Sequence, residues 1–503
     1  MTLARQNFSW PTLLPVLQKV AWATFLIALP VTSFPYLPEA IGGAALVRPL
    51  SLYPLLFLLV TVTIPRLFTN PIPKTIQTLL PFILIALASS LLSTQRGVEP
   101  LLGVSVTDRT IRALLTLGIG CAFYLTAALL PKTLVELRAS LRWLYTGFAV
   151  ALLWGSLQAV YVISFDSAYY KFLNQLQRYI STRKIFTTRV SGMTYEPNWF
   201  AEQISFLLMP WLLASVLSGQ SVFSWRWKRV TIEWILLLWS VVVLIFTFSR
   251  AGLANLVLML LISLIFLRSA GKHKPGRTRS RLSIWSRRLL EAGIVVAIIA
   301  GLIYIASTRN EYFARIWDYR LDKERQNTED YFEYIGFGAR FMYAEAAYNT
   351  YAENPILGVG LGNYAFYFDR MLPDEFLARM PEVLRILTPE VGRNRLITPK
   401  NLYFRILAET GLIGLAAFIA FLVAILGCAL YLWLSQDRGQ RYWGTAGLLG
   451  VLVFFVAAFS FDSFAIPNMW VIFGLITSAA WTYARHGSAL LPVAETLPVI
   501  GDQ

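Results

Sequence analysis

The sequence is poor in the residues that hold metals or form disulfides. Its 503 residues include 2 cysteines and 2 histidines. Cys121 and Cys428 both lie inside long apolar runs, where an unpaired thiol acts as a small hydrophobic side chain. His273 and His486 lie in basic stretches that are typical of loops. We therefore expect no disulfide framework, no metal site and no cofactor.

Charged residues are also scarce. Only 14% of the chain is Asp, Glu, Lys or Arg, whereas 56% is hydrophobic. A soluble protein of this length needs more charge to cover its surface. The apolar residues fall into blocks of roughly 20, the length that a helix needs to cross a ~30 Å hydrocarbon core. The composition therefore predicts an all-α, polytopic integral membrane protein. We expect it to contact membrane lipid and to bind no nucleic acid.

The apolar blocks predict a bundle of about twelve transmembrane helices. The first block runs on into further spans and lacks a small-residue cleavage site, so we expect no cleavable signal peptide. The expected spans are 20–37, 48–64, 77–93, 110–130, 142–165, 198–217, 232–248, 251–267, 290–307, 410–434, 443–460 and 467–484.

The connector 268–289 sets the predicted orientation. It carries eight Lys and Arg residues and no acid, and short loops rich in Lys and Arg stay in the cytoplasm. With this connector inside, both termini are cytoplasmic as well. The segments 166–197 and 308–400 then lie outside. We therefore expect a protein of the bacterial inner (plasma) membrane with a large periplasmic insert.

The predicted organisation has four parts: 1–307 with the first nine spans, 308–400 as the insert, 401–485 with the last three spans, and 486–503 as a cytoplasmic tail. The outer segment 166–197 is predicted to be an interfacial helix followed by a loop, because its apolar residues recur at helical spacing. Within the mainly helical insert, amphipathic pieces are expected at 338–352 and 374–387.

Arg250 stands out among the outer cations. It lies in Phe-Ser-Arg-Ala-Gly at 248–252, a tight connection between two apolar helices. An ionised side chain at that depth is costly and normally needs an anionic partner. Arg250 either snorkels to the interface or serves as a fixed cation for a phosphate or carboxylate, whose oxygens a guanidinium matches in pairs.

Arg189 heads a second polar stretch, 189–199, just before a predicted span. Glu196 and Asn198 follow in the same stretch, and Asn198 suits a helix cap. Here the structural alternative to ligand binding is an ion pair between Arg189 and Glu196.

Arg340 opens an amphipathic helix that is expected to end near Glu353. An ion pair with Glu345 is the structural alternative to ligand contact.

The glycine run 354–364 superficially resembles a dinucleotide fingerprint, but no hydrophobic strand precedes it. Its alternate glycines either form a plain turn or expose backbone N–H groups to an anion. After the insert, the stretch 398–414 returns polar side chains to the membrane surface. They are Lys400, Asn401, Arg405 and Glu409.

These segments together resemble the O-antigen ligase and polymerase superfamily of bacterial envelope-glycan enzymes. The matching stretches are 189–199, 248–252, 340–364 and 400–414, in the family's order. The most specific part is 340–414, where Asn-Pro-x-x-Gly-Val-Gly-x-Gly-Asn-Tyr precedes Asn-x-Tyr-x-x-x-Leu-Ala-Glu-x-Gly-x-x-Gly. The first 180 residues match only in hydropathy.

The resemblance implies a metal-independent glycosyltransferase of cell-envelope polysaccharide biosynthesis. The donor would be a glycan on a polyprenyl diphosphate such as undecaprenyl diphosphate. The acceptor would be a lipopolysaccharide core sugar or a growing chain. On this resemblance Arg250, Arg340 and Arg189 hold the diphosphate. Preorganised arginines can stabilise the charge that gathers on a departing diphosphate. Acceptor-binding or structural roles fall to Asn198, Asn401 and Tyr403.

One position departs from the family's pattern, because Lys400 stands where its ligases usually have His. Lysine is protonated near neutral pH and accepts a proton only where burial or nearby cations lower its pKa. Lys400 therefore binds diphosphate with Glu196 or Glu409 as the base, or is itself the catalytic base, or the protein is not a ligase.

A ligase-like enzyme is the favoured interpretation, and a polysaccharide polymerase is the first alternative. A bicarbonate or solute transporter, or a transport accessory, is a rival from another class, and a non-catalytic scaffold is a third. Transporters often show half-repeats and broken helices at the midplane, which the sequence does not display. We expect Arg250, Arg340 and Lys400 to converge on one outer cavity.

Overall fold

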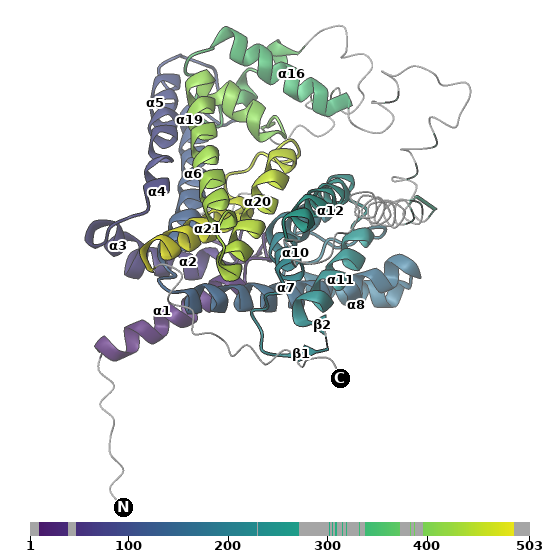
Figure 1. The fold of residues 1–503 in the computed structure, drawn as a ribbon. Coiled ribbons are helices and arrows are strands. Elements are labelled where there is room, and N and C mark those ends of the chain that lie inside the picture. Colours follow the sequence, from purple (N-terminus) through teal and green to yellow (C-terminus); the bar gives the residue numbers. More distant parts are fainter. Residues whose placement is uncertain are drawn as a thin grey trace, which may run out of the picture.

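The computed structural model describes residues 10–38, 47–228, 230–270, 338–372 and 396–486, with single positions between 301 and 331 and at 383 and 387. Almost all regular structure in these residues is helical (Figure 1). The exception is a two-residue hairpin of β1 (Arg226–Trp227) and β2 (Val230–Thr231), paired antiparallel.

The first half of the chain forms helices up to α8. Their bounds are α1 Trp10–Ile27, α2 Leu52–Leu58, the π-helical turn η2 Leu59–Thr63, α3 Ile64–Thr69, α4 Lys74–Gln77, α5 Leu80–Ser93, α6 Val106–Leu129, α7 Leu134–Ile163 and α8 Ser167–Gln177.

The second half continues with helices on both sides of the insert. Their bounds are α9 Pro197–Glu202, the π-helical turn η3 Gln203–Leu208, α10 Met209–Ser218, α11 Ile232–Phe246, α12 Arg250–Ala270, α16 Gly338–Glu353, the 3₁₀ turns η4 Asn363–Phe366 and η5 Asp369–Met371, α19 Leu402–Trp433, α20 Arg438–Ala457 and α21 Pro467–His486.

Six helical segments of the described residues are long and apolar enough to cross a membrane. They are Leu52–Thr69, Lys74–Ser93, Val106–Leu129, Leu134–Ile163, Pro197–Ser218 and Leu402–Trp433. Shorter apolar helices occur at Leu13–Ile27, Ile232–Phe246 and Arg250–Ser263. The chain is therefore a helical, multi-pass membrane protein, and the total of about twelve spans stays a prediction.

Three predicted spans have boundaries far from the observed ones. The first was expected at 20–37, but α1 ends at Ile27 because Pro30 lacks the N–H that would continue the helix. The fifth was expected from 142, but α7 already begins at Leu134, after the cap residue Thr133. The tenth was expected from 410, but α19 already begins at Leu402. Its polar first turns are helical because Asn401 caps them.

Other predictions fall largely outside the described residues. These are the span 290–307, the insert piece 374–387, the connector from 271 onward and the tail from 487. The predicted helix at 338–352 corresponds to α16, and α8 followed by a loop occupies 166–197.

Small residues let the last three helices pack closely on the rest. A side chain at Gly474 of α21 would strike the backbone of α6 near Tyr124, and one at Gly444 of α20 would strike the backbone of α19 at Trp433. Close backbone approach through small residues is the usual way in which helices associate in membranes. Gly474 thus lets α21 pack directly on α6, and Gly444 lets α20 pack directly on α19.

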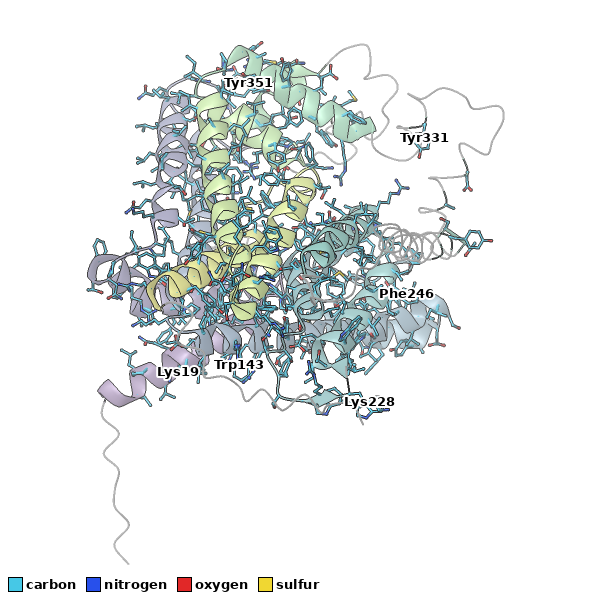
Figure 2. All side chains as sticks on the ribbon, viewed as in Figure 1. Lys19, Trp143, Lys228, Phe246, Tyr331 and Tyr351 are labelled. Atoms are coloured by element: carbon cyan, nitrogen blue, oxygen red, sulfur yellow. The ribbon has the colours of Figure 1, made fainter. Side chains whose placement is uncertain are left out.

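The segment 359–372 and the beginning of α19 lie beside helix α16 at one end of the bundle (Figure 1). Helix α16 lies across the ends of α5 and α19 (Figure 1). Tyr351 of α16 lies at the end opposite to Lys19 and Lys228 (Figure 2). Beneath α16 is a second hydrophobic cluster, built from α16 itself, the segment 359–372 and Ala408. The insert is therefore anchored on the beginning of α19.

Candidate functional site

The glycine run 354–364 is a turn that clamps onto α19. Gly358, Gly360 and Gly362 all have positive φ, at 66°, 92° and 84°, a conformation that suits glycine. The Val359 amide donates to the carbonyl oxygen of Ala408 at 3.0 Å, and the Gly360 amide donates to that of Glu409 at 2.9 Å. These N–H groups are used within the protein, so the structure favours the plain turn over an anion-binding run.

The same run ties α5 and α6 to the site. The side-chain Nδ2 of Asn363 donates to Ser93 Oγ at 2.9 Å and to Thr110 Oγ1 at 3.0 Å. The Leu361 amide donates to Ser90 Oγ at 3.1 Å. Buried polar groups that are all hydrogen-bonded fix one arrangement of the chain. Three segments far apart in the sequence are therefore held in one place.

Asn401 and Tyr403 have structural contacts at the start of α19. Asn401 Oδ1 accepts hydrogen bonds from the amides of Tyr403 at 3.0 Å and Phe404 at 3.2 Å, which makes Asn401 the helix cap. The Tyr403 hydroxyl donates to the carbonyl of Phe455 at 3.1 Å. Of the two roles predicted for these residues, the contacts match the structural one.

Lys400 joins α19 to α16 and to the loop between α20 and α21. Its φ is 52°, unusual for a residue with a side chain. Its amide donates to Asp462 Oδ2 at 2.7 Å, and its Nζ lies 4.6 Å from the centre of the Tyr343 ring. A lysine held over an aromatic face keeps a favourable cation–π contact. Lys400 is thus fixed just before the first residue of α19.

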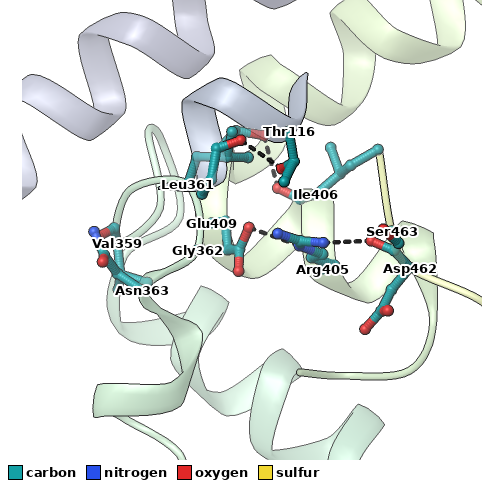
Figure 3. A network of polar contacts seen from close by, with 12 residues as sticks. Thr116, Val359, Leu361, Gly362, Asn363, Arg405, Ile406, Glu409, Asp462 and Ser463 are labelled. Atoms are coloured by element: carbon teal, nitrogen blue, oxygen red, sulfur yellow. Dashed lines mark hydrogen bonds and ion pairs between the residues drawn. The ribbon is translucent and has the colours of Figure 1, made fainter. Parts of the chain in front are cut away.

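Arg405 and Glu409 form a buried ion pair on successive turns of α19. Arg405 Nε lies 3.0 Å from Glu409 Oε2, and both side chains are buried. The Arg405 guanidinium also donates to the carbonyl oxygen of Asp462, as Figure 3 shows. A buried guanidinium needs such partners, because an uncompensated charge away from water is expensive. Glu409 therefore holds Arg405 in place.

Arg109 at the start of α6 completes this group. Its Nε donates to the carbonyl oxygen of Gly362 at 3.0 Å, and it lies within electrostatic range of Arg405, Glu409 and Asp462. We call Arg109, Lys400, Arg405, Glu409 and Asp462 the α19 cluster. It contains three cations and two carboxylates, so its formal charge is positive.

Tyr364 supports this cluster from the side of the insert. It is fully buried, and its hydroxyl donates to the carbonyl oxygen of Tyr343 at 2.8 Å. Burial, followed by nearby ionisable groups that include Asp462 and Glu409, raises the pKa of Tyr364 well above its usual value. The Tyr364 phenol is therefore a neutral donor. Its hydrogen bond helps to fix Tyr343, over whose ring Lys400 lies.

A second polar group lies at the start of α9. Arg189 Nε donates to the carbonyl of Thr247 at 2.8 Å, and its Nη2 donates to Asn198 Oδ1 at 2.8 Å. Glu196 pairs with Arg183 at 2.9 Å. The proposed pair of Arg189 with Glu196 is therefore wrong, because the turn places Arg183 against that carboxylate.

Asn198 is not the helix cap that its position in the sequence predicted. The cap position is Glu196, and Pro197 takes the first helical position, where its missing N–H costs nothing. Asn198 thus lies inside the first turn, and its side-chain oxygen holds Arg189.

Arg250 belongs to the same neighbourhood, as the first residue of α12. Phe248 has a positive φ of 46°, and Ser249 Oγ accepts from the Gly252 amide at 3.3 Å. Thr247, which holds Arg189, precedes this turn. A helix N-terminus favours anions. We call the group Arg183, Arg189, Glu196, Asn198 and Arg250 the α9 cluster.

Arg340 lies in the first turn of α16, one turn before Tyr343. The structural alternative for Arg340, an ion pair with Glu345, does not occur between these two described residues. Five positions along a helix place two side chains on different faces. Lys400 contacts Tyr343, one helical turn from Arg340. The convergence of Arg250, Arg340 and Lys400 on one cavity stays a prediction.

Glu202 is the last residue of α9 and was not identified from the sequence. It is buried, and its Oε1 accepts from the Asn468 amide nitrogen at 3.3 Å, at the start of α21. Its neighbour Ala201 packs where a side chain on Gly252 of α12 would lie. An acid inside an apolar span is a signal that could have singled it out.

Arg109 and Asp462 were also missed. Each lies at the end of a predicted span, where one charged residue in sequence looks like many others. Only their contacts with the glycine run and with Lys400 distinguish them.

The arrangement defines a multi-pass membrane protein with a cation-rich polar site at one end of its bundle. Residues 235–419 match the family model described as O-antigen ligase. This stretch includes Arg250, Arg340 and the polar beginning of α19. The match confirms the resemblance to the O-antigen ligase superfamily and supports a membrane function of ligase or polymerase type. No curated protein matches the chain.

Proposed function

We propose that the protein is a ligase-like glycosyltransferase at the outer leaflet of the bacterial inner membrane. It moves a glycan from a polyprenyl diphosphate, such as undecaprenyl diphosphate, to a lipid or glycan acceptor. The observation that carries this proposal is the α19 cluster, which has more cations than carboxylates. Lys400, Arg405 and Glu409 lie inside the range that matches the family model, and Arg109 and Asp462 lie outside it. A polymerase of the same superfamily would differ in its acceptor.

The cations of the α19 cluster suit the leaving group of this reaction. A departing diphosphate gathers negative charge, and fixed cations stabilise it without having to reorganise. Arg405 is held by Glu409, and Arg109 is held by the glycine run. In this mechanism Lys400, Arg109 and Arg405 face the diphosphate, and the reaction needs no metal.

The cations of the α9 cluster and Arg340 are proposed to capture the donor. Guanidinium groups bind phosphate oxygens in pairs. Arg189 is oriented by Thr247 and Asn198, and Arg250 opens the helix that follows Thr247. These arginines hold the carrier while the α19 cluster acts on the bond that breaks.

The contacts also bear on the choice of general base. Glu196 and Glu409 are each paired with an arginine, so their oxygens are already engaged as ion-pair acceptors. Asp462 is half-exposed and lies beside Lys400. We therefore assign proton removal from the acceptor hydroxyl to Asp462 and a positioning role to Glu409.

A transfer assay tests the proposal. Full-length protein in proteoliposomes receives a polyprenyl-diphosphate oligosaccharide and an acceptor glycan, and the released carrier is quantified. Asp462→Asn is expected to lower kcat at least ~100-fold, as loss of a general base does. Arg226→Gln, an exposed cation of β1, is the matched control. Solute or bicarbonate flux without any glycan transfer would reject the enzyme in favour of a transporter.

A further inference from the structure

Helix α16 has two different faces. Its buried face carries Ala339, Met342, Tyr343, Ala346 and Ala347, which pack into the second hydrophobic cluster. On another face Phe341 is 55% exposed and Tyr348 is 53% exposed. These two rings lie two helical turns apart on the same side of the helix. Large aromatic side chains that are exposed together often mark a binding surface.

The exposed face of α16 forms one wall of a groove, and the beginning of α19 forms the other. The groove has a volume of about 320 Å³ and is lined by Phe341, Ala344, Glu345, Tyr348 and Phe404. This volume lies near the lower end of the range for small-molecule sites, roughly 300–1,000 Å³. We call it the α16 groove.

The α16 groove adjoins the α19 cluster. Phe404 lies in the first turn of α19, and its amide is capped by Asn401, the neighbour of Lys400. Lys400 itself lies over Tyr343 on α16. Phe404 therefore connects the α16 groove to the end of α19 that carries Lys400.

The lining of the groove selects for one class of ligand. Among the residues that the structure describes, three aromatic rings and one carboxylate line it, and no Lys or Arg does. An ionised carboxylate only accepts hydrogen bonds, so the occupant must supply donors. A phosphate would be repelled, and a hydrocarbon chain would bury Glu345 without a partner, which is costly. Neutral sugar rings offer hydroxyl donors and apolar ring faces that suit aromatic side chains.

We propose that the α16 groove binds the neutral sugar units of the substrate, with Phe341 and Tyr348 packing on the rings and Glu345 accepting from their hydroxyls. The proposal rests on the proposed function for the order of substrate parts, from diphosphate to glycan. The class of ligand, a neutral sugar, is inferred from the residues that line the groove alone.

Binding of carrier-free glycan tests this proposal independently of catalysis. Full-length protein in nanodiscs of phosphatidylethanolamine and phosphatidylglycerol is applied to an array of neutral oligosaccharides that lack any diphosphate. Wild-type protein is expected to retain at least one oligosaccharide. The double variant Phe341→Ala/Tyr348→Ala is expected to lose at least tenfold in binding, and Tyr348→Phe is expected to keep most of it.

The controls separate this inference from the proposed function. Tyr179→Ala removes an aromatic ring that is 66% exposed after α8 and is expected to leave glycan binding unchanged. Binding that depends on Phe341 and Tyr348 in a protein without transfer activity would keep the groove and reject the enzyme.

Three results would overturn the groove assignment. They are no retained oligosaccharide, equal binding by the double variant and the wild type, and photo-crosslinking of a diazirine-tagged polyprenyl phosphate at Phe341 or Tyr348. The last result would assign the groove to the lipid tail. A matched thermal unfolding midpoint for the double variant and the wild type shows that the loss of binding does not come from misfolding.

Discussion

The α19 and α9 clusters hold their arginines in different ways. Arg405 is buried, with Glu409 at 3.0 Å. In the α9 cluster the side chains of Arg183 and Glu196 are 37% and 40% exposed, although their atoms lie at 2.9 Å. The two ion pairs therefore have similar N–O distances but different interaction energies, because water screens the pair of Arg183 with Glu196 and not the pair of Arg405 with Glu409. This difference is the basis on which we propose the α19 cluster for the chemical step and the α9 cluster for capture of the charged donor.

Breaking the two ion pairs should give the largest contrast. Glu409→Leu leaves the Arg405 charge buried without its partner and is expected to lower the free energy of unfolding by about 3–5 kcal/mol. Glu196→Leu is expected to cost about 0–1 kcal/mol. Reversible unfolding in mixed micelles measures both. Equal losses would show that the exposure difference has no energetic meaning.

The glycine run offers the next test, because it is what fixes Arg109 beside α19. Gly360→Ala combines a φ of 92° with a collision at Ser93 and is expected to lower both stability and transfer, with about 1–3 kcal/mol from the backbone alone. Gly97→Ala is the matched control, since its φ is 63° and nothing lies within 4 Å of the added Cβ. The difference between the two variants isolates packing against α5. If both lose the same amount, the clamp does not position the site.

Kinetics should separate the two clusters by role. Arg109→Gln is expected to lower kcat, whereas Arg189→Gln is expected to raise the KM for the lipid-linked donor about 10-fold with kcat nearly kept. The second effect corresponds to one charged hydrogen bond of about 1.5 kcal/mol. Steady-state transfer rates over a range of donor concentrations measure both parameters. A fall in kcat for both variants would merge the clusters into a single catalytic group.

Salt should produce the smallest effect. Exposed charges are screened as the Debye length falls from about 10 Å at 0.1 M salt to about 3 Å at 1 M. The donor KM is expected to rise a few-fold over that range through the α9 cluster, while kcat changes little. In Arg189→Gln the salt dependence of KM should become shallower. A kcat that falls with salt as steeply as KM rises would contradict the assignment of the buried cluster to the chemical step.

The helices were largely predictable, because hydrophobicity is a local property of the chain. Spans predicted at 232–248 and 467–484 lie close to α11 and α21. The boundaries failed where one polar or cyclic residue decides them. Pro30 follows the end of α1, and Asn401 starts α19 ahead of its apolar stretch.

The candidate site was predictable only in part. The stretch 398–414 identified Lys400, Arg405 and Glu409, because they share one helix end. Arg109 is brought to the site through Gly362, which lies 253 positions away. No local pattern in the sequence predicts that contact.

The sequence by itself determined that the chain crosses a membrane and that its polar motifs lie at the ends of spans. Burial of apolar side chains in lipid follows from composition within one segment. Only the tertiary structure decided which charges meet. Arg183 rather than Arg189 pairs with Glu196, and Arg109 joins Arg405 beside the glycine run. The physical reason is that an ion pair depends on which helix ends are brought together, and close packing at small residues such as Gly474 fixes this.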